Sequence, residues 1–185
     1  MTDFVTSDLH FGHTNIMKFC PVTRARFKND VEYMNEAMIE EWNAVVKPTD
    51  RTFILGDVCF SSWEKAVKIL ERLNGSKFLI VGNHDKKLVK TREFRDQFTE
   101  VRDYYDMHVN GTKVVMFHYP IAEWDQMHRG SVHLHGHLHG GTSGLEAYRA
   151  RDVGMDATGM IVRKLESVVA EALRGEIKGH HQKGD

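Results

Sequence analysis

The sequence predicts an α/β fold with mixed β-sheets, and two patterns along the chain support this prediction. In the first half, short apolar runs such as 78–81 alternate with helical patterns. Strands that alternate with helices in this way usually pair in parallel. In the second half, Asn110-Gly111 separates the runs 104–109 and 112–117, which indicates an antiparallel hairpin. Parallel and antiparallel neighbours in one chain predict mixed sheets.

Composition is that of an ordinary globular protein. The 185 residues are 41% hydrophobic and 28% charged, with a formal net charge of −1. We expect one domain over residues 1–175 and a polar tail over 176–185. The near-neutral charge favours neither a membrane partner nor a stable nucleic-acid partner, and the oligomeric state stays open. Without an apolar stretch of about 20 residues or a signal peptide, the expected location is the cytoplasm.

Two helices are expected in the first half of the chain. Apolar residues recur at spacings of three and four over 31–46, and Pro48 ends the pattern. The segment 61–64 has the pattern of a capping box, which would open a second helix with Trp63 on its buried side. Gly75 would close that helix.

Later elements are less regular. A third helix is expected from residue 86 to about 98, and a last one over about 163–173 after a strand near 152–155. His180 and His181 fall in the polar tail, where we expect them to be exposed to solvent. Cys20 and Cys59 are too few and too separated for a disulfide framework, so both are expected to be reduced packing residues.

Five apolar runs each end in residues that commonly bind metal ions. The run ends are Asp8-Leu9-His10, Gly56-Asp57, Gly82-Asn83-His84-Asp85, His118 and Gly136-His137-Leu138-His139. Strands carry such residues to one edge of a sheet, where the following loops share a crevice. The carboxylates, the amide and the imidazoles would therefore converge. This convergence predicts an active site for a pair of metal ions.

Each motif taken singly has a simpler explanation. Asp8 and His10 lie on one side of an extended segment, but this spacing often occurs by chance. The segment 82–85 could form a turn and a helix N-cap, and His118 alone would be structural. The occurrence of all five motifs in one order, each after an apolar run, favours the metal site.

The ordered set of motifs resembles the calcineurin-like metallophosphoesterase superfamily. The opening segment 7–16 is similar to that of its small stand-alone members from bacteria and phages. The resemblance covers about residues 3 to 156. It implies a four-layer α/β/β/α sandwich of two mixed β-sheets with helices on the outside.

The resemblance also implies ligands for two divalent metal ions. One ion would be held by Asp8, His10, Asp57 and His139, and the other by Asp57, Asn83, His118 and His137. Oxygen and imidazole ligands without thiolate suit Mn, Fe, Zn, Ni or Co, and Mn is the ion we expect. Two such ions about 3.5–4 Å apart share a hydroxide and clamp the phosphoryl oxygens for in-line attack.

His84 and Asp85 are the catalytic candidates. In this superfamily the His that matches His84 protonates the leaving oxygen or stabilises charge on the phosphoryl group. A positioned imidazolium acid contributes about 10²–10⁴-fold to a rate. Asp85 would orient the His84 imidazole or cap the following helix.

Substrate contacts are less well specified. His13 and Asn15 would touch the substrate phosphate or stabilise the turn, and Arg26 lies in the basic stretch 24–28, which would bind a phosphate or be solvated. Lys86 and Lys87 open another basic stretch, which would guide nucleic acid or form an ordinary exposed helix face.

These features predict a metal-dependent phosphoesterase that hydrolyses phosphodiesters, especially small nucleotides including cyclic ones. Val58-Cys59 follows Asp57 where the protein Ser/Thr phosphatases have a further Asp and an Arg, which argues against a phosphoprotein phosphatase. A single-strand nuclease or a phosphomonoesterase is the alternative enzyme. A scaffold with the same fold, such as the retromer subunit of the superfamily, would lack a ligand or the acid His, and this chain lacks neither.

Overall fold

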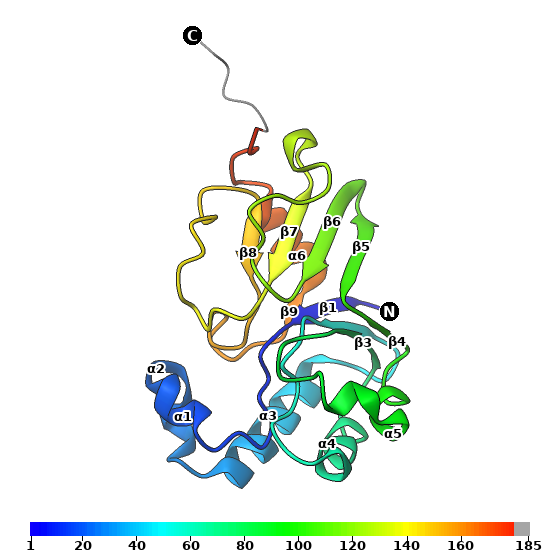
Figure 1. Ribbon diagram of the computed structural model, residues 1–185, viewed down its shortest axis with the longest axis vertical. Coiled ribbons are helices and arrows are strands. Elements are labelled where there is room, and N and C mark those ends of the chain that lie inside the picture. The colour runs from blue at the N-terminus through cyan, green and yellow to red at the C-terminus, as the bar shows by residue number, and fades with distance from the viewer. Residues whose placement is uncertain (180–185) are drawn as a thin grey trace.

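The computed structural model describes residues 1–179 and consists of two β-sheets with helices around them (Figure 1). The first sheet has five strands in the order β4-β3-β2-β1-β9. These are β4 (Glu100–Arg102), β3 (Ser76–Ile80), β2 (Arg51–Ile54), β1 (Asp3–Thr6) and β9 (Arg163–Lys164). The first four strands are parallel to one another, and β9 is antiparallel to β1.

The second sheet has four strands in the order β5-β6-β7-β8. These are β5 (Tyr104–Val109), β6 (Thr112–Phe117), β7 (Val132–His135) and β8 (Ala150–Asp152). β5 and β6 form the predicted antiparallel hairpin, whereas β6, β7 and β8 are parallel. Asn110 (φ 48°) and Gly111 (φ 81°) are both left-handed, as a tight hairpin turn requires. Both sheets are therefore mixed, and the predicted fold class is confirmed.

The helices lie mainly along the outer side of the five-stranded sheet. They are α1 (Ile16–Phe19), α2 (Pro21–Arg24), α3 (Val31–Val45), α4 (Trp63–Leu70), α5 (Arg92–Arg95) and α6 (Leu165–Ala172), with the 3₁₀ turns η1 (Ala25–Phe27), η2 (Leu88–Lys90) and η3 (Met127–Arg129). α3 begins where predicted, because the carboxylate of Asp30 accepts hydrogen bonds from the Glu32 and Tyr33 N–H groups, each at 3.0 Å. α6 packs against β1 and β9 of one sheet and β8 of the other.

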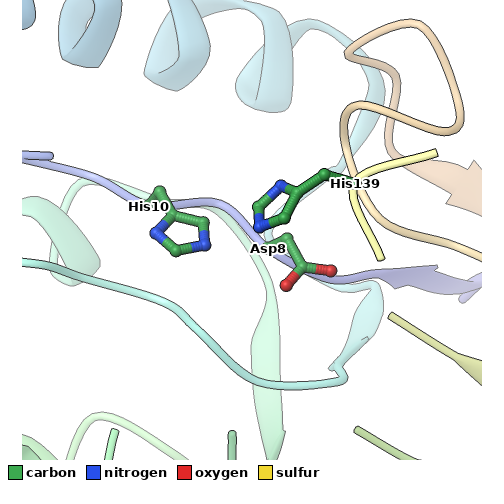
Figure 2. A group of neighbouring side chains, drawn as sticks. All are labelled: Asp8, His10 and His139. Atoms are coloured by element: carbon green, nitrogen blue, oxygen red, sulfur yellow. The ribbon is translucent and has the colours of Figure 1, made fainter. Parts of the chain in front are cut away.

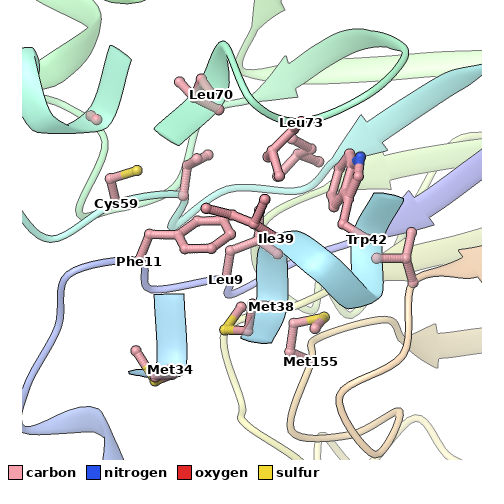
Figure 3. Packing of buried hydrophobic residues seen from close by; sticks show 14 of the residues in the cluster. Leu9, Phe11, Met34, Met38, Ile39, Trp42, Cys59, Leu70, Leu73 and Met155 are labelled. Carbon is pink, nitrogen blue, oxygen red and sulfur yellow. The ribbon is translucent and has the colours of Figure 1, made fainter. Parts of the chain in front are cut away.

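Buried apolar residues form three clusters. The first lies between the five-stranded sheet and α3, α4 and α5, and Figure 3 shows Met38, Ile39 and Trp42 of α3 packed in it. The second joins the inner faces of the two sheets to α6. The third places η3 and neighbouring loops against the far face of the four-stranded sheet, through Trp124 and Met127. The predicted sandwich of two mixed sheets flanked by helices is confirmed.

The start of α4 differs from the prediction. Ser62 is the N-cap residue, its side chain makes no capping hydrogen bond, and Trp63 is 37% exposed. The capping-box prediction and the burial of Trp63 were therefore wrong. The physical reason is a shift of one residue: with Ser62 as the N-cap, Glu64 occupies the second helical position instead of the third that a capping box needs.

Short elements also differ from the prediction. The helix expected over 86–98 is divided into η2 and α5, and β8 lies two residues earlier than expected. β4 and β9 are strands of three and two residues, too short to show a periodic pattern. Among residues 1–179, no helix has the length and apolar character needed to cross a bilayer.

The chain beyond Gly175 is described only to residue 179. The Glu176 N–H donates to Ala147 O at 2.9 Å, so backbone pairing extends one residue into the predicted tail. His180 and His181 lie outside the described residues. The boundary at residue 175 stays a prediction.

Replacing Trp42 by Ala should lower the free energy of unfolding by about 3–5 kcal/mol. Trp42 is 1% exposed, and its Nε1 donates to Asn74 O at 3.0 Å, so the change leaves both a cavity and an unpaired carbonyl. Urea unfolding measures the effect, and Trp63→Ala is the matched control, with an expected loss below about 1 kcal/mol. Equal losses in the two variants would contradict this packing.

Candidate metal centre

All the predicted ligands follow carboxyl ends of neighbouring strands. Asp8 and His10 follow β1, Asp57 follows β2, and Asn83 and His84 follow β3. His118 follows β6, and His137 and His139 follow β7. Because β1, β2 and β3 are parallel, and β6 and β7 are parallel, each sheet delivers its polar residues at a single edge. The two edges meet.

The side chains gather in two groups of possible metal ligands. Figure 2 shows the first, in which ligand atoms of Asp8, His10 and His139 all lie within 4.8 Å of one another. The same spacing joins Asp57, His118 and His137 in the second group. Each group combines one carboxylate with two imidazoles.

Asp57 connects the two groups. Its Oδ2 lies 3.7 Å from Nε2 of His10 and 3.6 Å from Nε2 of His118. His118 Nε2 is also 2.9 Å from Asn83 Oδ1, so Asn83 faces the second group. His118 Nδ1 is 2.7 Å from Leu55 O, which fixes the imidazole with Nε2 toward Asp57.

Two buried atoms of the first group have no hydrogen-bond partner within residues 1–179. They are Asp8 Oδ1 and His10 Nε2. A buried polar atom without a partner costs about 1–3 kcal/mol, and such atoms are rare in native proteins. The other carboxylate oxygen, Asp8 Oδ2, accepts from the His137 N–H at 2.8 Å. A cation among these atoms would satisfy both, so the residues fit a divalent metal ion.

Burial determines the protonation states of the candidate metal ligands. It lowers the pKa of His10 to about 2 and also lowers the pKa of His118, so both imidazoles are neutral at pH 7, the form that ligates metals. Burial likewise raises the pKa of Asp8 to about 7. A bound cation would oppose that effect, because it stabilises the carboxylate.

Backbone strain is concentrated at the same positions. Left-handed φ values between 50° and 73° occur at five predicted ligands: Asp8, His10, Asp57, His137 and His139. A non-glycine residue in this region is uncommon and costs about 1–3 kcal/mol unless its surroundings hold it there. The strain therefore makes these residues candidates for a functional site.

Asp85 supports the centre through hydrogen bonds from backbone N–H groups, and within residues 1–179 it forms no hydrogen bond or ion pair with the His84 ring. Its Oδ2 accepts from the N–H groups of Asp57 (2.8 Å) and Gly82 (2.9 Å), and its Oδ1 accepts from Val58 N–H (3.0 Å). The carboxylate is fully buried. Both predicted roles, orienting His84 and capping a helix, are replaced by a third: Asp85 ties the loop after β2 to the loop after β3.

Asp156 and Arg24 form a second support that sequence patterns did not reveal. Asp156 Oδ2 lies 2.8 Å from His139 Nδ1, which leaves Nε2 of His139 to face the first group. Arg24 donates through Nε and Nη2 to the two Asp156 oxygens, at 2.9 and 3.0 Å. Nη2 also donates to Asp8 O at 2.8 Å.

Arg24 is completely buried, so it belongs neither to a solvated basic stretch nor to a phosphate site. Although burial opposes it, the hydrogen bond to Asp156 raises the pKa of His139. Asp156 lies 132 residues from Arg24 in the chain, and no local motif joins them.

His84 lies on the open side of the centre. Its side chain is 40% exposed, and its Nε2 lies 3.9 Å from Asp57 Oδ2. The His84 N–H donates to Asp57 Oδ1 at 2.9 Å. The loop that carries His84 is thus fastened to the carboxylate that joins the two groups.

The three candidate substrate contacts have different surroundings. His13 Nδ1 lies 3.1 Å from His10 Nδ1, next to the first group. Asn15 is exposed at the start of α1, and Arg26 forms a two-point ion pair with Glu41 at 2.6 and 2.7 Å. In the described structure neither Asn15 nor Arg26 makes a hydrogen bond, ion pair or ring contact with a predicted ligand.

Changing Asp156 to Asn should weaken the binding of divalent metal by about 10- to 100-fold. The amide keeps the size of the side chain but removes the negative charge beside His139 Nδ1. Titration of metal-free protein with Mn²⁺, followed by calorimetry, measures the affinity. Asp125→Asn, an exposed carboxylate paired with Lys113, should leave it unchanged. An unaltered Mn²⁺ affinity in the folded Asp156→Asn variant would contradict the proposed role of Asp156 in positioning His139.

Comparisons with known proteins agree with the geometry. The family model of calcineurin-like phosphoesterases matches residues 4–141. The uncharacterized protein MJ1445 of Methanocaldococcus jannaschii is 38% identical over 138 residues, which cover 74% of this chain and 68% of that protein. The gene 66 protein of Mycobacterium phage L5 is 27% identical over 190 residues, covering 87% and 89%.

A solved structure shows a shared fold. The protein of unknown function AQ665 from Aquifex aeolicus superposes with a TM-score of 0.72 at 22% identity, over 92% of this chain and 98% of that one. The family model spans more than half of the chain and includes every predicted ligand. The chain belongs to the calcineurin-like phosphoesterase family.

Proposed function

We propose that this protein is a phosphodiesterase that uses two divalent metal ions, with Mn²⁺ as the leading candidate, to hydrolyse small nucleotides, cyclic ones included. The family makes the chain a phosphoesterase, and hence a hydrolase. The observation that carries the finer proposal is the pair of ligand groups joined by one oxygen of Asp57.

Each ion would be held by residues of one group. Asp8, His10 and His139 would bind the first ion and His118, His137 and Asn83 the second, with Asp57 shared. When bound, such a pair lowers the pKa of water and polarises the phosphoryl oxygens. The unpaired Asp8 Oδ1 and His10 Nε2 support the first assignment.

His84 would donate a proton from its imidazole to the leaving oxygen. Its position on the open side, with Nε2 at 3.9 Å from Asp57 Oδ2, supports a role beside the phosphoryl group and not as a metal ligand. An alkoxide leaving group is a strong base and depends on such a proton. The hydrogen bond from the His84 N–H to Asp57 Oδ1 keeps His84, the proposed acid, at a fixed distance from the centre.

The first test is a panel of metal ions and substrates. Metal-free protein is loaded with Mn²⁺, Ni²⁺, Co²⁺, Zn²⁺ or Mg²⁺ and assayed with bis-p-nitrophenyl phosphate, p-nitrophenyl phosphate and cyclic nucleotides. We expect hydrolysis of the diesters with Mn²⁺ and none without metal. Asp57→Asn should remove both turnover and the second equivalent of bound metal.

Two outcomes of the panel would overturn the proposal. Hydrolysis of monoesters alone would make the protein a phosphomonoesterase. Absence of turnover with every ion, in protein shown to be folded, would favour the scaffold hypothesis.

Changing His84 to Ala should lower turnover about 10²–10⁴-fold on diesters that release an alkoxide, with metal content unchanged. The loss should be smaller on bis-p-nitrophenyl phosphate, because p-nitrophenolate is a weak base and leaves without a proton. His108→Ala, an exposed imidazole on β5, serves as the matched control. Equal losses on both leaving groups would exclude the acid role.

A further inference from the structure

A cavity of about 470 Å³ opens directly beside the candidate metal centre. Its lining includes Asn83 and His84 of the centre, Phe60, Lys86 and Lys87. Because His84 borders both the centre and the cavity, a group that leaves toward His84 would leave into this cavity.

Phe60 is an exposed aromatic ring held by its neighbours. It is 45% exposed, yet it stacks on His13 with ring centroids 4.1 Å apart and 16° between the planes. Its edge contact with His84 has a centroid separation of 5.0 Å. The Phe60 N–H donates to Phe11 O at 2.7 Å, which fixes the backbone. A fixed and partly exposed ring is suited to stacking with a planar group.

Lys86 and Lys87 supply positive charge without an acidic partner. Both are exposed, and neither ammonium group forms a hydrogen bond or ion pair within the described residues. The exposed Arg72, by contrast, is paired with Glu36 at 2.6 Å. The cavity therefore presents two cations to an anionic ligand.

We propose that this cavity is the leaving-group subsite for a nucleotide that carries a second phosphate. The base stacks on Phe60, and the second phosphate faces Lys86 and Lys87, while the reacting phosphoryl group lies at the metal centre. This proposal rests on the proposed function. In the reaction, water loses one proton to solvent as its oxygen bonds to phosphorus. The bond from phosphorus to the nucleoside oxygen breaks, and that oxygen takes a proton from His84, which solvent then restores.

The test for base stacking on Phe60 measures binding, so it does not depend on turnover. Calorimetry on the Mn²⁺-loaded protein compares AMP with ribose 5-phosphate, which lacks the base. We expect AMP to bind about 5- to 150-fold more tightly, the range that stacking of one base provides. Phe60→Ala and Phe60→Leu should abolish the difference, and Phe60→Tyr should keep it. Tyr33→Ala, an exposed ring on α3 outside the cavity, is the matched control.

The test for the lysines adds a second phosphate to the same ligand. Adenosine 3′,5′-bisphosphate should bind about 2- to 10-fold more tightly than AMP, and added salt should reduce this gain. The double variant Lys86→Gln/Lys87→Gln should lose it, and Lys90→Gln should not.

The outcomes separate this subsite from the proposed function. Equal affinity for AMP and ribose 5-phosphate, or a base preference that survives Phe60→Leu, would overturn the subsite even if diesters are hydrolysed. A base preference that depends on Phe60, in a protein that hydrolyses no ester, would support the subsite and reject the proposed function.

Discussion

The position of the Asp57 carboxylate is the constraint on which the candidate centre depends. One of its oxygens lies between His10 and His118, and the other is held by the His84 N–H. Its own N–H is fixed by Asp85. The loop after β3 must approach closely for this to happen: a Cβ at Gly82 would lie 2.3 Å from Asp57 Oδ1. Glycine at that position is therefore a packing requirement of the centre.

The second sheet is joined to the first by contacts of the same kind. Asp8 Oδ2 accepts from the His137 N–H, and Leu55 O meets both Ser7 Oγ and His118 Nδ1. A Cβ at Gly136 would lie 2.0 Å from Ser7 Oγ, so only glycine permits this approach. At the candidate centre the two sheets thus meet through backbone groups and polar side chains, and the ligand side chains are positioned as a consequence.

The sequence allowed prediction of what depends on local pattern. Asn110-Gly111 indicated the hairpin because its turn needs two left-handed residues, and the apolar runs indicated the strands whose ends carry Asp8 and Asp57. Partners far apart in the chain were not predictable: Arg24 looked like a surface residue until its contact with Asp156, 132 residues later, was known. Asp85 was misjudged because its neighbour in sequence is not its partner in space.

Contacts around the centre offset its unfavourable contributions to the free energy of folding. Five left-handed candidate ligands and two unpaired buried atoms are unfavourable in the folded protein without metal. Asp85, Asp156 and Arg24 hold the loops, with full burial and charge-assisted hydrogen bonds. Since a cation would relieve the unpaired atoms only in the folded state, binding it must stabilise the fold by mass action. Stability and metal affinity would therefore be coupled through the same residues.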